Sequence, residues 1–313
     1  MSPVTGQILG RIAMAQLHVI AGAEARPARP TIRTITISDL LDALARGWAD
    51  FSAMPSHVLF LLLIYPMVAV FAAGLTMGYN ILPLAYPIMA GFALIGPIVA
   101  IGLYEMSRRR EAGLEADPSH AFDVLQSPSL PAIAALGLLL LAIFLTWIGL
   151  AQQIYQSLFG YLPPSSLPQF ISSVLTTPEG WQLILLGNAV GFVFALVSFV
   201  LSVVSFPLLL DRDVGAAVAI TTSLRAIARN PVTMVVWGLI VAGLLLLGSL
   251  PFFVGLAVVI PVLGHATWHL YRKVVDVADL PPIELRQKPP KGRRYAADFP
   301  ASLFPFYSKD KKP

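Results

Sequence analysis

The sequence predicts an all-α polytopic membrane protein, a transmembrane helical bundle with about six spans arranged as three hairpins. Three observations lead to this prediction. The 313 residues are 57% hydrophobic and only 12% charged, whereas soluble domains carry about 25% charged residues. The apolar residues fall into blocks close to the length of about 20 residues that crosses a bilayer core. All 21 lysines and arginines can be placed on one side of the membrane.

The apolar blocks define the spans. Because lipid offers no hydrogen-bond partners to the backbone, each block is expected to be a helix. Very short turns at 78–80 and 249–250 join the helices of the first and third hairpins, and an outer loop at 152–180 that is expected to lie on the membrane interface joins those of the second. The six predicted spans are residues 58–77, 81–104, 131–151, 181–210, 232–248 and 251–268.

The basic residues set the orientation of these spans. With the N-terminus in the cytoplasm, every lysine and arginine falls in a cytoplasmic segment, and of the 17 acidic residues only Glu179 lies outside. Removal of residues 12–25 as a leader peptide would invert this pattern. We therefore predict cytoplasmic termini on both sides of a transmembrane domain at 38–280: an N-terminal segment at 1–37 and a basic, proline-rich tail at 281–313 that is extended or disordered.

Each hairpin is preceded by a short amphipathic segment. Residues 38–51 (SDLLDALARGWADF) predict a helix that lies in the membrane interface with Ser38 as its N-cap. Residues 218–228 resemble this pattern, and 121–126 form a weaker version. A residue–proline pair follows each segment and redirects the chain into the membrane. The pattern indicates a threefold internal repeat, although any chain with three cytoplasmic loops could look similar. Matching prolines occur in the second helix of each hairpin, at Pro97, Pro207 and Pro261.

Four stretches, in the same order, resemble the DUF2189 family of bacterial integral membrane proteins. They are IVAIGLYEMSRRREAG (98–113), SFPLLLDRDVGAAVAI (205–220), SLRAIARNPVTMVVWGLI (223–240) and VVIPVLGHATWHLYRKVV (258–275). The resemblance covers about residues 35–280 and implies a location in the bacterial inner membrane. The family has no known function, and some of its members are labelled as relatives of cytochrome oxidase subunits.

A catalytic oxidase subunit does not fit this sequence. Such a subunit needs six histidines for two haems and copper, and the chain has five histidines in all. An accessory role beside a respiratory oxidase therefore remains open.

A histidine pair is the feature that most resembles a chemical site. His265 and His269 are four residues apart, which places both rings on one helix face, and imidazole is a common metal or haem ligand. In the repeat alignment, Glu105 and Asp211 occupy positions that match the two histidines. These four residues are the candidate metal ligands. The alternative is that they are ordinary polar residues at a membrane interface.

Other residues are candidates for contacts with lipid or with a partner protein. Trp48 lies on the predicted interface helix, and the arginine run at 108–110 suits a topology anchor that contacts anionic lipids. A polar group around Arg212 could form a docking surface, although a helix boundary with local ion pairs would look the same. The full set is Trp48, Arg108, Arg109, Arg110, Arg212, Arg225 and Arg229.

The sequence favours a non-catalytic accessory, assembly or interaction subunit of an inner-membrane complex. It contains no phosphate-binding loop, nucleophile elbow or paired intramembrane carboxylates, and no cysteine. Its partners are expected to be the lipid bilayer and other membrane subunits, such as a respiratory oxidase, and not nucleic acid; whether the protein binds a cofactor stays open. Two alternatives stay open: a transporter or lipid-handling protein for apolar or uncharged substrates, and a metal- or haem-binding protein that uses the histidine pair.

Overall fold

The computed structural model describes residues 30–54, 79–162, 164–250 and 253–285. These residues are almost entirely helical, which confirms the predicted all-α class. The chain divides into two units, residues 1–283 and 284–313, and only the first is described below. The predicted first span at 58–77, the tail from residue 286 onward and residues 1–29 lie outside the described residues.

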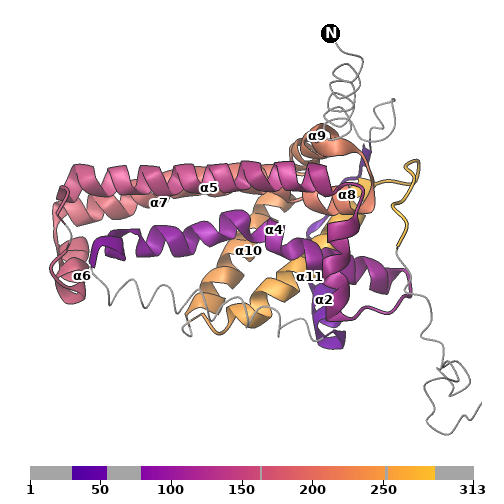
Figure 1. Cartoon of the computed structure of the whole chain (residues 1–313), viewed down its shortest axis with the longest axis horizontal. Helices are drawn as coiled ribbons and strands as arrows, with labels where there is room; N and C mark the ends of the chain where they lie inside the picture. The colour runs from indigo at the N-terminus through magenta and orange to yellow at the C-terminus, as the bar shows by residue number, and fades with distance from the viewer. Residues whose placement is uncertain (1–29, 55–78, 163, 251–252, 286–313) are drawn as a thin grey trace, which may run out of the picture. The chain divides into compact units, whose positions relative to one another are not determined.

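Figure 1 shows the arrangement of the described helices and strands, coloured in chain order. They are β1 (Thr31–Ile32), α2 (Ile37–Ala53), η1 (Tyr79–Leu84), α4 (Ala85–Glu111), η2 (Pro118–Gln126), α5 (Leu130–Phe159), α6 (Leu167–Thr176), α7 (Pro178–Ser202), α8 (Ser205–Asp211), α9 (Gly215–Arg229), α10 (Pro231–Ser249), α11 (Leu256–Val274) and β2 (Val275–Asp276). The two short strands pair antiparallel, and η1 and η2 are 3₁₀ helices.

Within the described part of the chain, four helical stretches are long and apolar enough to cross a membrane. They cover residues 82–111, 130–159, 178–211 and 231–249. They correspond to the predicted second, third, fourth and fifth spans, most of them extended at one or both ends. The fourth is not one continuous helix, because α7 ends at Ser202 and α8 begins at Ser205.

The sixth predicted span differs from the structure. The span was predicted at residues 251–268, whereas the helix found there, α11, begins at Leu256 and ends at Val274. Helix α11 is not among the four long apolar stretches. Its second half is rich in buried residues, including Trp268 and Tyr271, and ends in Arg272 and Lys273. Much of the surface of α11 therefore contacts protein.

Helices α5 and α7 lie side by side (Figure 1), and Trp147 of α5 lies at their centre. A Cβ atom added to Gly191 of α7 would lie 3.1 Å from the Trp147 ring, so the glycine lets the two helices approach closely. The Trp147 indole donates a 3.0 Å hydrogen bond to the Pro87 carbonyl of α4. Most of the outward side chains of this pair are exposed leucine, valine and phenylalanine.

The predicted outer loop contains more helix than expected. Helix α5 continues to Phe159, and α6 fills much of the remainder. In α6, Leu167, Ile171 and Leu175 are exposed and recur every four residues, so they form one apolar stripe along the helix. This arrangement is typical of a helix that lies on a membrane interface.

The predicted interface helix at 38–51 is present as α2, but its N-cap is Thr36 and not Ser38. The Thr36 side chain and the Asp39 carboxylate form a capping box, in which Asp39 accepts a 2.8 Å hydrogen bond from the Thr36 amide. An acidic residue three positions after a threonine is the usual signature of such a box. The sequence pattern predicts Ser38 in place of Thr36, because serine is also a favourable N-cap residue.

Helix α2 packs along α11 with one face only. Leu40, Ala43 and Gly47 are buried, and a Cβ atom added to Gly47 would lie 2.6 Å from the Ala266 amide nitrogen of α11. Ile37, Leu41 and Trp48, on a different face, are 44%, 60% and 55% exposed. The helix therefore keeps an outward apolar face suited to lipid, as predicted, and uses another face for protein packing.

Asn230 joins the third hairpin to the start of the chain. It ends α9 and precedes Pro231 of α10, which agrees with the predicted redirection at this pair. Its side chain accepts a 2.9 Å hydrogen bond from the Ile35 amide and donates a 3.0 Å bond to the Arg33 carbonyl. Together with the pairing of β1 and β2, these bonds fix residues 30–35 against the packed unit.

Candidate functional site

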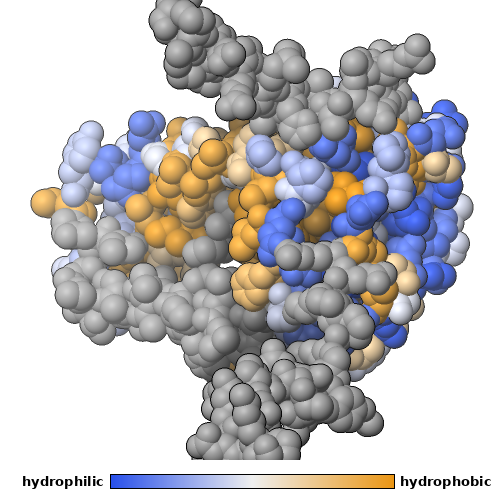
Figure 2. All heavy atoms as spheres, turned by 45° about the vertical axis from the view of Figure 1, so that its right-hand side comes forward, coloured by the Kyte–Doolittle hydropathy of each residue, from blue (hydrophilic) through white to orange (hydrophobic). Residues whose placement is uncertain are grey.

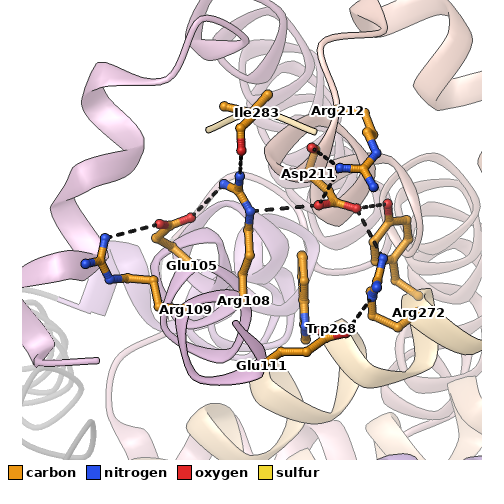
Figure 3. Close-up of polar contacts among 10 residues, drawn as sticks. Glu105, Arg108, Arg109, Glu111, Asp211, Arg212, Trp268, Arg272 and Ile283 are labelled. Atoms are coloured by element: carbon orange, nitrogen blue, oxygen red, sulfur yellow. Dashed lines mark hydrogen bonds and ion pairs between the residues drawn. The ribbon is translucent and has the colours of Figure 1, made fainter. Parts of the chain in front are cut away.

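Buried charged side chains gather around the C-terminal half of α4 (Figure 3). The sequence YEMSRRRE places acidic and basic groups three and four residues apart, so neighbours on the helix surface can pair. Other helices contribute the remaining partners. We call this group the ion-pair network, and it consists of Glu105, Arg108, Arg109, Glu111, Asp123, Asp211, Arg212 and Arg272.

Arg108 lies at the centre of the network. Its Nη1 is 3.1 Å from Glu105 Oε2, its Nε is 3.8 Å from Asp211 Oδ1 of α8, and its guanidinium also donates to the Ile283 carbonyl. On the other side of Glu105, Arg109 pairs with Asp123 of η2 at 3.2 Å. The Arg108 and Arg109 side chains are only 9% and 3% exposed.

Asp211 extends the network to α11. It accepts a 2.8 Å hydrogen bond from the Tyr271 hydroxyl, and its carboxylate lies 3.3 Å from Arg212 and 3.5 Å from Arg272. Burial, reinforced by the Asp211 carboxylate, raises the pKa of Tyr271 well above its ordinary value, so the hydroxyl remains a donor.

Glu111 lies at the end of the network that reaches the surface of the molecule. It pairs with Arg272 at 3.0 Å and accepts a 2.9 Å hydrogen bond from the Trp268 indole. Removing one member of a buried ionic group leaves the other charge uncompensated, at a cost of about 3–5 kcal/mol. The network therefore fixes α4, α8 and α11 in one relative position.

A second polar group, the histidine cluster, joins α2, α4 and α11. It consists of Asp50, Ser107, Arg110, His265 and His269. Asp50 Oδ2 accepts a 2.5 Å hydrogen bond from Ser107 Oγ and lies 2.8 Å from His269 Nε2, while Oδ1 lies 2.6 Å from Arg110 Nη1. Ser107 Oγ is also 2.8 Å from His265 Nδ1.

The environment of Asp50 favours its charged form. Burial alone raises the pKa of a carboxyl group, but at Asp50 the hydrogen bonds from His269 and Ser107 outweigh burial and lower the pKa. Asp50 is thus an ionised carboxylate at the centre of the cluster. The spacing of residues 38–51 does not indicate this role, because the partners of Asp50 come from helices far away in the chain.

A cleft of about 460 Å³ opens beside the histidine cluster. It lies where the polar side of α2 faces the C-terminal ends of α4 and α11. Figure 2 turns this side of the molecule toward the viewer and shows hydrophilic residues gathered beside hydrophobic ones. The cleft is lined by Arg46, Asp50, Arg110, Glu111, His269, Arg272 and Lys273.

The four predicted metal ligands are divided between the two groups. Glu105 and Asp211 belong to the ion-pair network, where arginines neutralise them, and His265 and His269 belong to the histidine cluster. The predicted ring of four ligands is therefore not assembled. In the part of the chain that the structure describes, no group of three or more histidine, aspartate and glutamate side chains is arranged to hold a metal ion.

The predicted lipid or partner contacts are also divided. Arg108, Arg109 and Arg212 are buried in ion pairs, so their side chains are not presented to lipid as expected. The spacing shows the local carboxylates Glu105 and Asp211, but it does not show that Asp211 also reaches Arg108 or that Asp123 of η2 reaches Arg109. The candidates that do reach the surface are Arg110 at the cleft, Trp48 on α2, and Arg225 and Arg229 on α9.

The chain was compared with known proteins. Its residues 85–211 match DUF2189, a family described as a predicted integral membrane protein. The resemblance seen in the sequence is confirmed over this segment, which is shorter than the expected 35–280. Together with the four long apolar helices, the match identifies the chain as an integral membrane protein that contacts the lipid bilayer. No curated protein and no solved structure was found to match the chain.

The DUF2189 segment runs from the start of α4 to the end of α8. It contains Glu105, Arg108 and Asp211 of the ion-pair network. Asp50, His265 and His269 lie outside it, so the histidine cluster and the cleft combine the DUF2189 segment with helices on both sides of it.

Proposed function

We propose that this protein is a non-catalytic accessory, assembly or interaction subunit of a bacterial inner-membrane complex, with both termini in the cytoplasm. A respiratory oxidase is a candidate for the complex. The observation that carries the proposal is the pairing of the ionisable groups: the buried carboxylates bind arginine, histidine or hydroxyl groups of other helices. In this protein, groups of the kind that an enzyme would use for catalysis instead hold helices together.

The chemistry of the paired groups supports this reading. A general base must reach the proton that it removes and must have a pKa near the working pH. Glu105 and Asp211 are buried and face guanidinium groups of this chain, so they are not presented to the proton of a substrate. Asp50 is held below its ordinary pKa by its partners, which makes it a weak base.

The outward glycines give a reason to expect a neighbouring subunit. Gly191 is explained by the ring of Trp147, but a Cβ atom added to Gly149 of α5 or to Gly187 of α7 meets no atom of the described residues within 4 Å. A glycine within a helix costs about 0.5–1 kcal/mol relative to alanine. Small residues on membrane helices allow a second helix to approach closely, so the α5–α7 pair is suited to contact a helix of another subunit.

The test is mass spectrometry of the protein purified in mild detergent from its native membrane at native expression. The expected result is a stoichiometric membrane partner. Gly187→Leu should remove the partner without unfolding the protein, whereas Gly243→Leu on α10, which also meets no neighbouring atom, serves as the matched control. Recovery of the wild-type protein without a partner would overturn the proposal.

Transport or lipid handling of an apolar or uncharged substrate is a second candidate. One observation favours it: Tyr86 and Asn188 form a 2.7 Å hydrogen bond within the apolar helices α4 and α7. Polar groups within membrane helices often mark a substrate path. Flux of a neutral solute into liposomes that contain only this protein, reduced by Asn188→Leu, would favour transport over the subunit role.

A further inference from the structure

The cleft beside the histidine cluster has the size of a small-molecule site, and all of its lining residues are polar or charged. Its volume of about 460 Å³ falls within the range of about 300–1,000 Å³ that is typical of small-molecule sites. Three helices contribute to its walls, so the cleft exists only in the folded protein. Four of its seven lining residues carry a permanent positive charge: Arg46, Arg110, Arg272 and Lys273.

The arginines retain hydrogen-bond donors for a ligand. A guanidinium group has five N–H donors in a planar fork that matches the oxygens of phosphate. Arg46 uses Nε for Asp42, Arg110 uses Nη1 for Asp50, and Arg272 uses Nε and Nη1 for Glu111 and Asp211. Their side chains are 62%, 40% and 36% exposed, so solvent and ligands can reach them.

Each cation of the cleft is paired with a carboxylate of this chain. Asp50 and Glu111, which line the cleft, pair with Arg110 and Arg272, and Asp42 pairs with both Arg46 and Lys273. The Arg46–Asp42 and Arg272–Glu111 pairs are exposed, and exposed pairs contribute little to stability. They can rearrange when a group with two negative charges, such as phosphate, enters the cleft.

The position of the cleft on α2 limits where the ligand comes from. Arg46 and Asp50 follow the side of α2 that carries Asp39 and Asp42, whereas Ile37, Leu41 and Trp48 form its exposed apolar side. If the apolar side faces the bilayer, the cleft lies at the level of the lipid headgroups or just above them. Both phospholipid headgroups and soluble phosphate compounds are found there.

We infer that the cleft lined by Arg46, Arg110, Arg272 and Lys273 binds a phosphate group, carried by either an anionic phospholipid or a soluble phosphate compound. The guanidinium donors bind the phosphate oxygens in a bidentate manner. The site is independent of the proposed subunit role, because it needs only α2, α4 and α11 of this chain.

The test uses the purified full-length chain and two probes. Inorganic pyrophosphate is titrated into the detergent-solubilised protein by calorimetry. In parallel, the protein is reconstituted into phosphatidylcholine vesicles with and without phosphatidylglycerol, and retained lipid is counted by native mass spectrometry. Saturable binding of pyrophosphate alone identifies a soluble ligand, and selective retention of phosphatidylglycerol identifies a lipid; each result supports the site.

Variants separate this cleft from general charge attraction. Arg46→Gln changes an exposed side chain and should leave the fold intact while it weakens binding roughly tenfold, and Arg110→Gln should do the same. Glu111→Gln removes a competing carboxylate and should tighten binding. Arg229→Gln is the control, because it removes the same charge from an exposed position on α9. Binding of neither probe, or an equal loss in Arg46→Gln and Arg229→Gln, would overturn the inference.

Discussion

Two regions of this membrane protein are stabilised in different ways. One is the charged region around the ion-pair network and the histidine cluster, and the other is the α5–α7 helix pair. Around the ion-pair network and the histidine cluster, polar groups are buried and paired across helices, and large side chains such as Phe206 and Trp268 are fully enclosed. In the α5–α7 pair, side chains such as Leu138 and Leu185 remain 66% and 67% exposed. Lipid solvates such leucines as well as protein does, so burying them between helices adds little.

This difference shows where the structural specificity of the chain lies. The α5–α7 pair depends on a few contacts, chiefly Trp147 against Gly191 and Phe194. The charged region depends on many directional contacts that only one arrangement of α2, α4, α8 and α11 can satisfy. Substitutions in the two regions should therefore differ in effect.

Asp211→Ala should have the largest effect. It leaves Arg108, Arg212 and Arg272 without a shared carboxylate and should lower the free energy of unfolding by about 3–5 kcal/mol. Denaturant titration in detergent, followed by circular dichroism, measures the change. Asp279→Ala, at an exposed position, is the control, and equal stability of the two variants would show that the network does not hold the helices.

The same substitution in both regions compares them directly. Gly47→Leu forces a side chain into the Ala266 backbone of α11 and should destabilise the protein by about 1–3 kcal/mol. Gly187→Leu, on the α5–α7 pair, enters open space and should leave the stability of the isolated protein unchanged. Thermal unfolding of both variants in the same detergent tests the comparison, which is contradicted if Gly187→Leu is the less stable.

Trp147→Phe should have a smaller effect. It keeps an aromatic ring against Gly191 but removes the indole hydrogen bond to the Pro87 carbonyl, which is worth about 1 kcal/mol. Denaturant titration measures the loss, with Trp181→Phe on an exposed surface of α7 as the control. A loss as large as that of Asp211→Ala would mean that the helix pair is as strongly specified as the charged region.

The smallest effect is a pH dependence at the start of α2. Hydrogen bonds from the Thr36 amide and hydroxyl, with Lys273, lower the pKa of Asp39 from 3.8 to about 2. Because the folded-state pKa is lowered, this contribution is fully present above about pH 4 and is lost as the pH falls toward 2. The protection of the first α2 amides against hydrogen exchange, measured relative to the intrinsic exchange rate at each pH, should fall over this interval. Asp39→Asn should exchange faster at neutral pH and respond less to acid.

Much of the fold could be predicted from the sequence because its signals are local. Apolar block length located the four long stretches, and proline pairs located the ends of α2 and α9. The packing of α11 could not be predicted, because an apolar run does not show whether its neighbour is lipid or protein. The burial of Trp268 and Tyr271 depends on packing that is absent from the local pattern.

The candidate site was only partly predictable, for a related reason. Residue types and spacing selected His265, His269, Glu105 and Asp211, and each of them does make buried or half-buried polar contacts. Their partners could not be read from spacing: Asp50 meets His269 across 219 positions of the chain. Glu105 and Asp211 both pair with arginine, which opposes the predicted ligand ring, and the contacts of Asp211 with Arg108 and Arg272 are tertiary.

The contact between α2 and α11 also constrains the order in which the protein folds during its synthesis. Lys273 pairs with Asp39 across 234 positions, so α2 leaves the ribosome long before α11 exists. Contacts between such distant segments form late, because the intervening chain must first be ordered. The buried face of α2 therefore lacks its main packing partner until α11, the last of the described helices, has been synthesised. The packing of the first described helix is completed late in the biogenesis of this protein.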